Sequence, residues 1–212
     1  MLALNYRKIT DTIRQKLKPK EAYTFLGLVF KSNYETYESS VNEQTLADFL
    51  KIPRDRVVDH IEKFRQMGLI IKDPKQYGMI KKNYYQVSTE HYFLVTDKIF
   101  ELDLTGDDIG FLLILKACCY NNTNLCLWSV NQLVENVAIS KPTVIKYLKR
   151  LEDKDIISRK DGKIKIIKEG IFLETQPTDI AVMRNFYPEA LDEEDFDSKG
   201  YWLPDEVRQM MK

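Results

Sequence analysis

The sequence predicts a mainly α-helical fold with small β-hairpins, an α+β class, and three observations predict it. Apolar residues recur at helical spacing in several segments that short polar loops separate. Two pairs of short strands each follow one of these helices, and each pair is joined by turn-forming residues. The apolar pattern of the first half also returns about 87 residues later in the second half. We therefore expect two copies of one small helical module.

The segment Ser140–Gly162 shows this module most clearly. Val144, Leu148 and Leu151 fall at i, i+4 and i+7 and form one apolar stripe of a helix. Basic residues occupy the other face, and a basic hairpin with Asp161-Gly162 at its turn follows directly. A buried-stripe helix with a basic outer face and a basic hairpin is typical of a winged helix-turn-helix, in which the hairpin is the wing.

The start of this helix reads Ser140, Lys141, Pro142, Thr143 and Val144, and Leu148 and Leu151 follow. With these residues the chain resembles, from Val130 to Gly170, the recognition helix and wing of MarR-type regulators. Ser140 suits the N-cap of this helix, and Pro142 suits its first turn. Asp155 stands where that family usually has a glycine in the left-handed conformation, which aspartate tolerates better than most residues. The resemblance implies a winged-helix fold that binds DNA.

The first copy is expected to span residues 1–90. Its predicted helices are Pro19–Asn33, Asn42–Leu50 and Arg54–Met67. The last of these is the recognition helix, and Gly68 is its expected C′ residue. A longer wing follows, framed by two predicted strands, Leu69–Asp73 and Met79–Val87. The polar residues 33–40 are predicted to form a loop.

The second copy is expected to span residues 91–174. Its predicted elements are a strand at Phe93–Val95, helices at Thr105–Cys119, Val130–Val137 and Ser140–Leu151, and strands that begin at Ile156 and Lys163. Thr105, with Asp108 three residues later, comes close to a capping box. The very apolar run Phe111–Leu115 indicates a helix that is buried on more than one side, either in the core or at a dimer seam. Residues 121–127 are predicted to form a loop.

A change of composition marks residues 175–212, which contain three prolines and the acidic run Asp192–Asp195. The formal net charge of the chain is zero. Its distribution is uneven, at about +6 for residues 1–87, about −1 for 88–174 and about −5 for 175–212. We expect an acidic C-terminal extension that screens a basic face, binds a partner or aids solubility. Affinity for a polyanion must then come from local basic faces.

The expected location is the cytoplasm, in association with the nucleoid. No apolar run reaches the roughly 18 residues that a membrane span needs, and the first residues lack the apolar core of an export signal. Three clustered cysteines, Cys118, Cys119 and Cys126, are not spaced as a zinc site. We expect reduced thiols, with Cys118 and Cys119 in or near the core.

The candidate DNA-binding residues follow from the winged-helix geometry, which needs base-reading residues near the start of a helix and cations aimed at phosphates. In the second copy they are Ser140, Lys141, Thr143, Lys146, Lys149 and Arg150 on the helix, with Arg159, Lys160 and Lys163 on the wing. In the first copy they are Arg54, Arg56 and Lys63 on the helix, with Lys75, Lys81 and Lys82 on the wing. Three carboxylates share that first helix and would repel phosphates, so it is predicted to be the weaker reader; they are Asp55, Asp59 and Glu62.

We expect no catalytic residue, metal or cofactor, and no enzyme activity. His60 and His91, the two histidines, lie far apart in different contexts. The chain has no glycine-rich phosphate loop, no nucleophile elbow and no H-E-x-x-H motif.

Three functions stay open, and a sequence-specific transcriptional regulator is favoured. The duplicated layout resembles plasmid and phage replication initiators, which also use two winged-helix domains. A protein-interaction scaffold is the third, because tandem winged helices that resemble those of chromosome-partition complexes serve as docking modules. The expected partner is double-stranded DNA. The sequence also allows a protein partner for the extension and a homodimer, and no membrane partner is expected.

Overall fold

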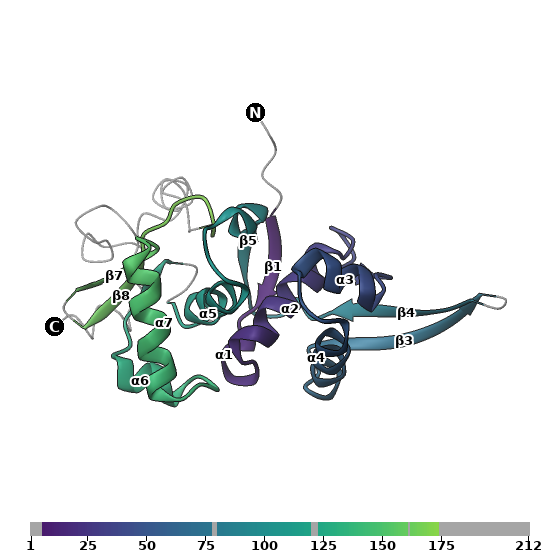
Figure 1. Cartoon of the computed structure of the whole chain (residues 1–212), viewed down its shortest axis with the longest axis horizontal. Coiled ribbons are helices and arrows are strands. Elements are labelled where there is room, and N and C mark those ends of the chain that lie inside the picture. The colour runs from purple at the N-terminus through teal and green to yellow at the C-terminus, as the bar shows by residue number, and fades with distance from the viewer. Residues whose placement is uncertain (1–5, 78–79, 120–122, 161, 174–212) are drawn as a thin grey trace, which may run out of the picture. The chain divides into compact units, whose positions relative to one another are not determined.

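Two similar sets of elements follow one another in the computed structural model, which describes residues 6–77, 80–119, 123–160 and 162–173. The first set comprises β1 (Tyr6–Thr10), α1 (Ile13–Lys16), α2 (Pro19–Phe30), β2 (Glu38–Ser39), α3 (Glu43–Leu50), α4 (Arg54–Gln66), β3 (Ile70–Tyr77) and β4 (Ile80–Val87). The second comprises β5 (Tyr92–Thr96), the 3-10 helix η1 (Asp97–Glu101), α5 (Gly106–Ala117), β6 (Leu125–Cys126), α6 (Val130–Glu135), α7 (Lys141–Asp153), β7 (Ile157–Lys160) and β8 (Lys163–Ile166). The predicted fold class, helices with small antiparallel hairpins, is confirmed (Figure 1).

The two sets share one plan. α4 and α7 differ by 87 in the numbers of both their first and their last residues, and so do β2 and β6. Each of these short strands adds a third strand to its hairpin, giving the orders β2-β4-β3 and β6-β8-β7. Both lie in segments that were predicted as loops, because two residues are too few to show an alternating pattern.

Helices α4 and α7 end in the same way. Gly68 follows α4 with φ +70°, and Asp155 follows α7 with φ 54°, so both have the left-handed conformation that was expected. The next residue then donates its N–H to the last turn: Leu69 to the carbonyl of Phe64, and Ile156 to that of Leu151, each at 2.9 Å. Asp155 therefore does in the second set what glycine does in the first.

The core of the chain contains α2 and α5, which pack closely against each other. Every residue of Phe111–Leu115 is fully buried, which places this run in the core of the chain. Gly110 permits the close approach, because a Cβ there would lie 1.8 Å from the carbonyl oxygen of Pro19. β1 and β5 also pair antiparallel, side by side in Figure 1, with Tyr6 opposite Thr96.

The described residues up to Phe172 form one compact unit, since the two sets share this packing. The domain boundary near residue 90 stays a prediction. Residues 174–212, with the predicted acidic extension, lie outside the described residues.

The first hairpin is longer than predicted and projects beyond the helices (Figure 1). Pairing continues to Tyr77 opposite Ile80, so Pro74 lies within β3 and not in a loop. A proline is tolerated there because β3 is an edge strand, whose outer N–H groups need no partner in the sheet.

Side chains tie β4 to α3. The hydroxyl of Tyr85 and the amide of Asn83 donate to Oε1 of Glu43, at 2.8 Å and 3.0 Å. Burial of the Glu43 carboxylate favours its neutral form, but hydrogen bonds from its own backbone and these two side chains outweigh that effect and lower its pKa. The long hairpin is thereby anchored to the helices at its base.

The three cysteines are free thiols. Cys118 and Cys126 are buried and Cys119 is half-buried, so the expected position in or near the core is confirmed. Burial raises the pKa of the Cys118 thiol and raises that of Cys126 to about 11, which keeps both groups protonated at neutral pH.

Candidate nucleic-acid interface

Helix α7 is fixed to the body by an apolar stripe. Val144, Leu148 and Leu151 are fully buried, as predicted. Tyr147 is a fourth inward residue, and its burial was not predicted. Its ring stacks on that of Phe111 in α5, with centroids 4.9 Å apart and planes 15° apart. The opposite side of the helix is therefore the side that faces outward.

Exposed lysines occupy that outward side. Lys146 and Lys149 lie one turn apart, and Lys141 is exposed in the first turn. No ion pair within the described part of the chain includes any of these three lysines. We refer to Lys141, Lys146 and Lys149 as the lysine face. Cations without carboxylate partners on an exposed helix can reach phosphate oxygens or base edges.

The N-terminus of α7 holds the two predicted hydroxyl-bearing residues. Ser140 is the N-cap residue and is exposed, and Thr143 is half-buried. Their hydroxyl oxygens lie 2.9 Å apart and share a hydrogen bond. The two side chains thus form one polar group beside Lys141.

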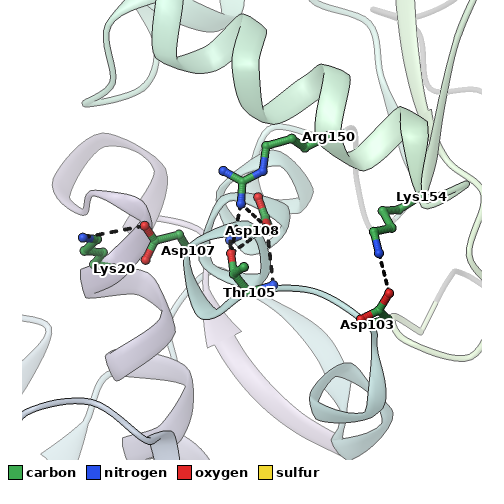
Figure 2. Close-up of polar contacts among 7 residues, drawn as sticks. All are labelled: Lys20, Asp103, Thr105, Asp107, Asp108, Arg150 and Lys154. Carbon is green, nitrogen blue, oxygen red and sulfur yellow. Dashed lines mark hydrogen bonds and ion pairs between the residues drawn. The ribbon is translucent and has the colours of Figure 1, made fainter.

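Arg150 turns inward from α7, toward the start of α5 (Figure 2). Its Nη2 donates to Oδ2 of Asp108 at 2.5 Å and to the hydroxyl of Thr105 at 3.1 Å. The Asp108 side chain is 5% exposed. Arg150 was predicted to contact DNA, but its charge is already paired with this carboxylate. It holds α7 against α5.

Lys63 occupies the same place on α4. Its Nζ lies 2.6 Å from Oε1 of Glu21 in α2, whose side chain is 11% exposed. Lys63 and Arg150 differ by 87 in number, as do Glu21 and Asp108, so the same ion pair occurs in both sets. One pair joins α4 to α2 and the other joins α7 to α5, so these two predicted cations face inward.

The second hairpin divides its cations in a similar way. Arg159 pairs with Glu152 of α7, and this hydrogen bond lowers the pKa of the Glu152 carboxyl. Lys160 is exposed, and Lys163 lies directly opposite it across the hairpin. Lys165 was not predicted, although it shares a strand face with Lys163 at two-residue spacing, the signal that could have identified it.

Helix α4 presents a different outward surface. Arg54 and Arg56 are exposed and take part in no ion pair with another described residue. The positions that match Lys146 and Lys149 are Asp59 and Glu62, and Glu62 binds Arg65 at 2.5 Å. Asp55 adds another exposed carboxylate. The middle of this outward surface is therefore acidic.

Three predicted lysines lie on the long first hairpin. In the backbone register Lys75 faces Lys82, and Gln76 faces Lys81. The structure describes these residues by their backbone alone. Their predicted contacts with the DNA backbone stay predictions.

A family described as a helix-turn-helix domain matches residues 102–157. This stretch begins directly after η1, contains α5, α6 and α7, and ends at the first residue of β7. A helix-turn-helix domain occupies this part of the chain. It includes the lysine face and the Arg150–Asp108 pair.

The other comparisons add little. No curated protein sequence matches the chain. A chain of a solved "Nse1-Nse3-Nse4 complex" aligns over 93% of this chain and 91% of that one, with 10% identity and a TM-score of 0.28. A likeness at that score carries no argument about fold or function.

Among the described residues, every helix is too short or too polar to cross a membrane. The same residues contain no cluster of three or more histidine, cysteine, aspartate or glutamate side chains that could hold a metal ion.

Proposed function

We propose that this protein binds duplex DNA through α7 and the β7–β8 hairpin, and that it is a sequence-specific transcriptional regulator. The major groove of B-DNA admits an α-helix, and residues at the start of that helix reach base edges. In this arrangement Lys141 and Thr143 approach the bases. Lys149 and the hairpin residue Lys160 contact the flanking phosphates.

One observation carries the proposal: inside a helix-turn-helix domain, the lysine face is exposed and, among the described residues, forms no ion pair with a carboxylate. The inward cation Arg150 is paired with Asp108, whereas Lys146 and Lys149 have no carboxylate partner within the described part of the chain and can bind an external anion. A polyanion such as duplex DNA supplies that anion at regular spacing.

The first set is proposed as a second winged helix with a minor part in DNA binding. Asp59 and Glu62 would lie against phosphates if α4 entered a groove as α7 does. Arg54 and Arg56 flank these carboxylates and suit contacts with the DNA backbone. Two unequal winged helices in tandem would then bind an extended site, with base reading concentrated on α7.

Two alternatives use the same surfaces differently. A replication initiator would also bind duplex DNA through α7, and an origin with short direct repeats beside the coding region would favour it. The acidic outward surface of α4 specifically favours the third function, a protein-interaction scaffold, because carboxylates repel DNA and attract basic partners.

The test is DNA binding by fluorescence anisotropy across a series of salt concentrations, on a random duplex pool. We expect Lys146→Ala with Lys149→Ala to weaken binding and to reduce the magnitude of the salt slope by about 1 for each phosphate contact that is lost. The matched control is Asp59→Ala with Glu62→Ala, at the corresponding positions of α4, which should not weaken binding. If the wild-type chain does not bind DNA at about 50 mM salt, the proposal is wrong and a protein-interaction scaffold is the better explanation.

Selection of bound duplexes from the same pool tests sequence specificity. We expect the wild-type chain to enrich one motif, and Lys141→Ala with Lys146→Ala to lose it. If this variant still enriched the same motif, the residues that contact the bases would lie on α4.

A further inference from the structure

A cavity of about 470 Å³ lies where α2, α3 and α4 face η1 and the start of α5. Its volume falls within the range of about 300–1,000 Å³ that is usual for small-molecule sites. The residues that line it come from both sets of elements, from Tyr23 and Arg56 to Phe100 and Asp107. The proposed DNA surface on α7 does not include it.

One wall of the cavity is aromatic. Phe49 and Tyr23 both contact Phe100, with ring centroids 5.2 Å and 6.4 Å from that of Phe100. Phe49 is 37% exposed, and the Nζ of Lys31 lies 4.1 Å from its ring centroid. A flat apolar group placed in the cavity would cover this exposed ring and gain its contact area.

Another part of the lining is cationic. Lys51 and Arg56 are exposed and, within the described residues, take part in no ion pair. Lys20 also lines the cavity, but Asp107 lies 3.8 Å from it and offsets its charge (Figure 2). His60 is half-buried with its Nδ1 2.7 Å from the hydroxyl of Thr24, and burial lowers its pKa, so it adds no charge at neutral pH. The charge available to a ligand is therefore that of Lys51 and Arg56.

We propose that this cavity binds a small organic anion that carries a flat, apolar ring system. The ring lies against Phe49 and Phe100, and the anionic group is held by Arg56 and Lys51. The planar guanidinium of Arg56 suits a carboxylate, sulfonate or phosphate, each of which offers two oxygens to its fork of N–H donors. This site would exist whether or not the chain binds DNA.

The experiment uses the full chain and two fluorescent probes of the same shape. 8-Anilinonaphthalene-1-sulfonate is a flat aromatic anion, and N-phenyl-1-naphthylamine is the same ring system without the sulfonate. We expect both to bind at one saturable site, with the anion about tenfold tighter, which corresponds to one charge-assisted contact.

Substitutions in the lining then test whether the probes bind in this cavity. Arg56→Gln should raise the dissociation constant of the sulfonate probe about tenfold and leave that of the neutral probe unchanged. Arg54→Gln is the matched control, because Arg54 is exposed on the same helix but does not line the cavity, and it should change neither constant. Phe49→Ala should weaken both probes. Circular dichroism melts check that all three variants fold.

Two results would overturn the proposal. The first is sulfonate binding that is unchanged in Arg56→Gln and in Lys51→Gln, which would place the probe elsewhere. The second is equal affinity for the charged and the neutral probe in the wild-type chain, which would show that the cations contribute nothing.

Discussion

Helices α4 and α7 are matched on their inward side and opposed on their outward side. At corresponding positions Ile61 and Leu148 are buried, and so are Phe64 and Leu151. Each helix also uses one cation to hold a buried carboxylate on the first long helix of its set. On the outward side, however, Asp59 stands where α7 has Lys146. Packing thus constrains one side of the helix, and the other side is free to take the charge that its partner requires.

One contact between α4 or α7 and the first long helix of its set has the same position but a different chemistry in the two sets. The ring of His60 in α4 bonds the hydroxyl of Thr24 in α2, whereas at the matching positions Tyr147 stacks on Phe111. Both pairs join the recognition helix to the first long helix. The first set does so with a polar contact and the second with an apolar one, so the geometry is kept while the chemistry changes.

The largest expected effect comes from exchanging the outward charges. Lys146→Asp with Lys149→Glu gives α7 the charges of α4, and we expect its affinity for DNA to fall at least a hundredfold, because two attractive contacts of about 1–3 kcal/mol each become repulsive. Anisotropy titrations at low salt measure this loss. Full affinity in this variant would contradict the assignment of the interface to α7.

The reverse exchange sharpens the comparison. Asp59→Lys with Glu62→Lys gives α4 the charges of α7, and a gain of up to about tenfold in affinity is expected if α4 lies close to the DNA. An unchanged affinity would show that α4 lies away from the duplex. Either outcome leaves the proposed role of α7 intact.

Core truncations test the matched side. Leu148→Ala and Ile61→Ala each remove a buried aliphatic side chain from the same place in their set, so each should cost about 2–5 kcal/mol in the free energy of unfolding. Urea denaturation gives these values. A large difference between the two would show that the inward sides are less equivalent than their burial indicates.

These inward positions were also the part of the fold that the sequence predicted best. Spacing alone indicated that Val144, Leu148 and Leu151 form the buried stripe, because apolar side chains at helical period have few other arrangements. Gly68 was predicted as the residue after α4 because glycine suits the left-handed conformation at a helix C-terminus, whereas the conformation of Asp155 was implied by the resemblance to MarR-type regulators.

Contacts between distant segments were not accessible from the sequence. Arg150 was predicted to contact DNA because a charged residue on an amphipathic helix has no visible partner in the sequence. Its partner Asp108 lies 42 residues away. The two-residue strands β2 and β6 were missed because tertiary pairing with β4 and β8, and not local pattern, forms them. The cavity beside Phe49 and Arg56 combines residues from five elements, so no single stretch indicated it.

The repeated ion pair is expected to have an intermediate effect. Asp108→Asn should cost about 1–3 kcal/mol in the free energy of unfolding, since it loses Arg150 and weakens the cap that Asp108 provides to Thr105 at the start of α5. Glu21→Gln should cost somewhat less, because the Glu21 side chain is more exposed. Thermal and urea unfolding measure both.

Arg150→Gln separates the two roles of Asp108. It leaves the cap but also leaves the buried Asp108 carboxylate without its cation, so its cost should be at least as large as that of Asp108→Asn. If Arg150→Gln left stability unchanged but reduced DNA affinity as strongly as Lys146→Ala, the predicted contact of Arg150 with DNA would be restored.

The smallest expected effect is a dependence of the free energy of unfolding on pH near neutrality, and it comes from His60 in the first set. Burial lowers the pKa of His60 below its ordinary value of 6.5, and the charges of Glu21 and Lys63 act in opposite directions on it. The unfolded chain therefore binds a proton at a higher pH than the folded chain does, so this contribution to stability is present above pH 6.5 and is lost as the pH falls toward the folded pKa.

His60→Gln should remove this contribution, so the difference in stability between wild type and variant should shrink as the pH falls from about 7 to about 5. Tyr147→Phe, at the matching position of α7, is the control, and its stability difference should be constant over that range because a tyrosine hydroxyl does not titrate there. Urea unfolding at a series of pH values gives both differences. A difference for His60→Gln that grows toward low pH would mean that the protonated imidazole is the stabilised form, with Glu21 and Asp59 outweighing burial. The polar contact of the first set would then be an ionic one.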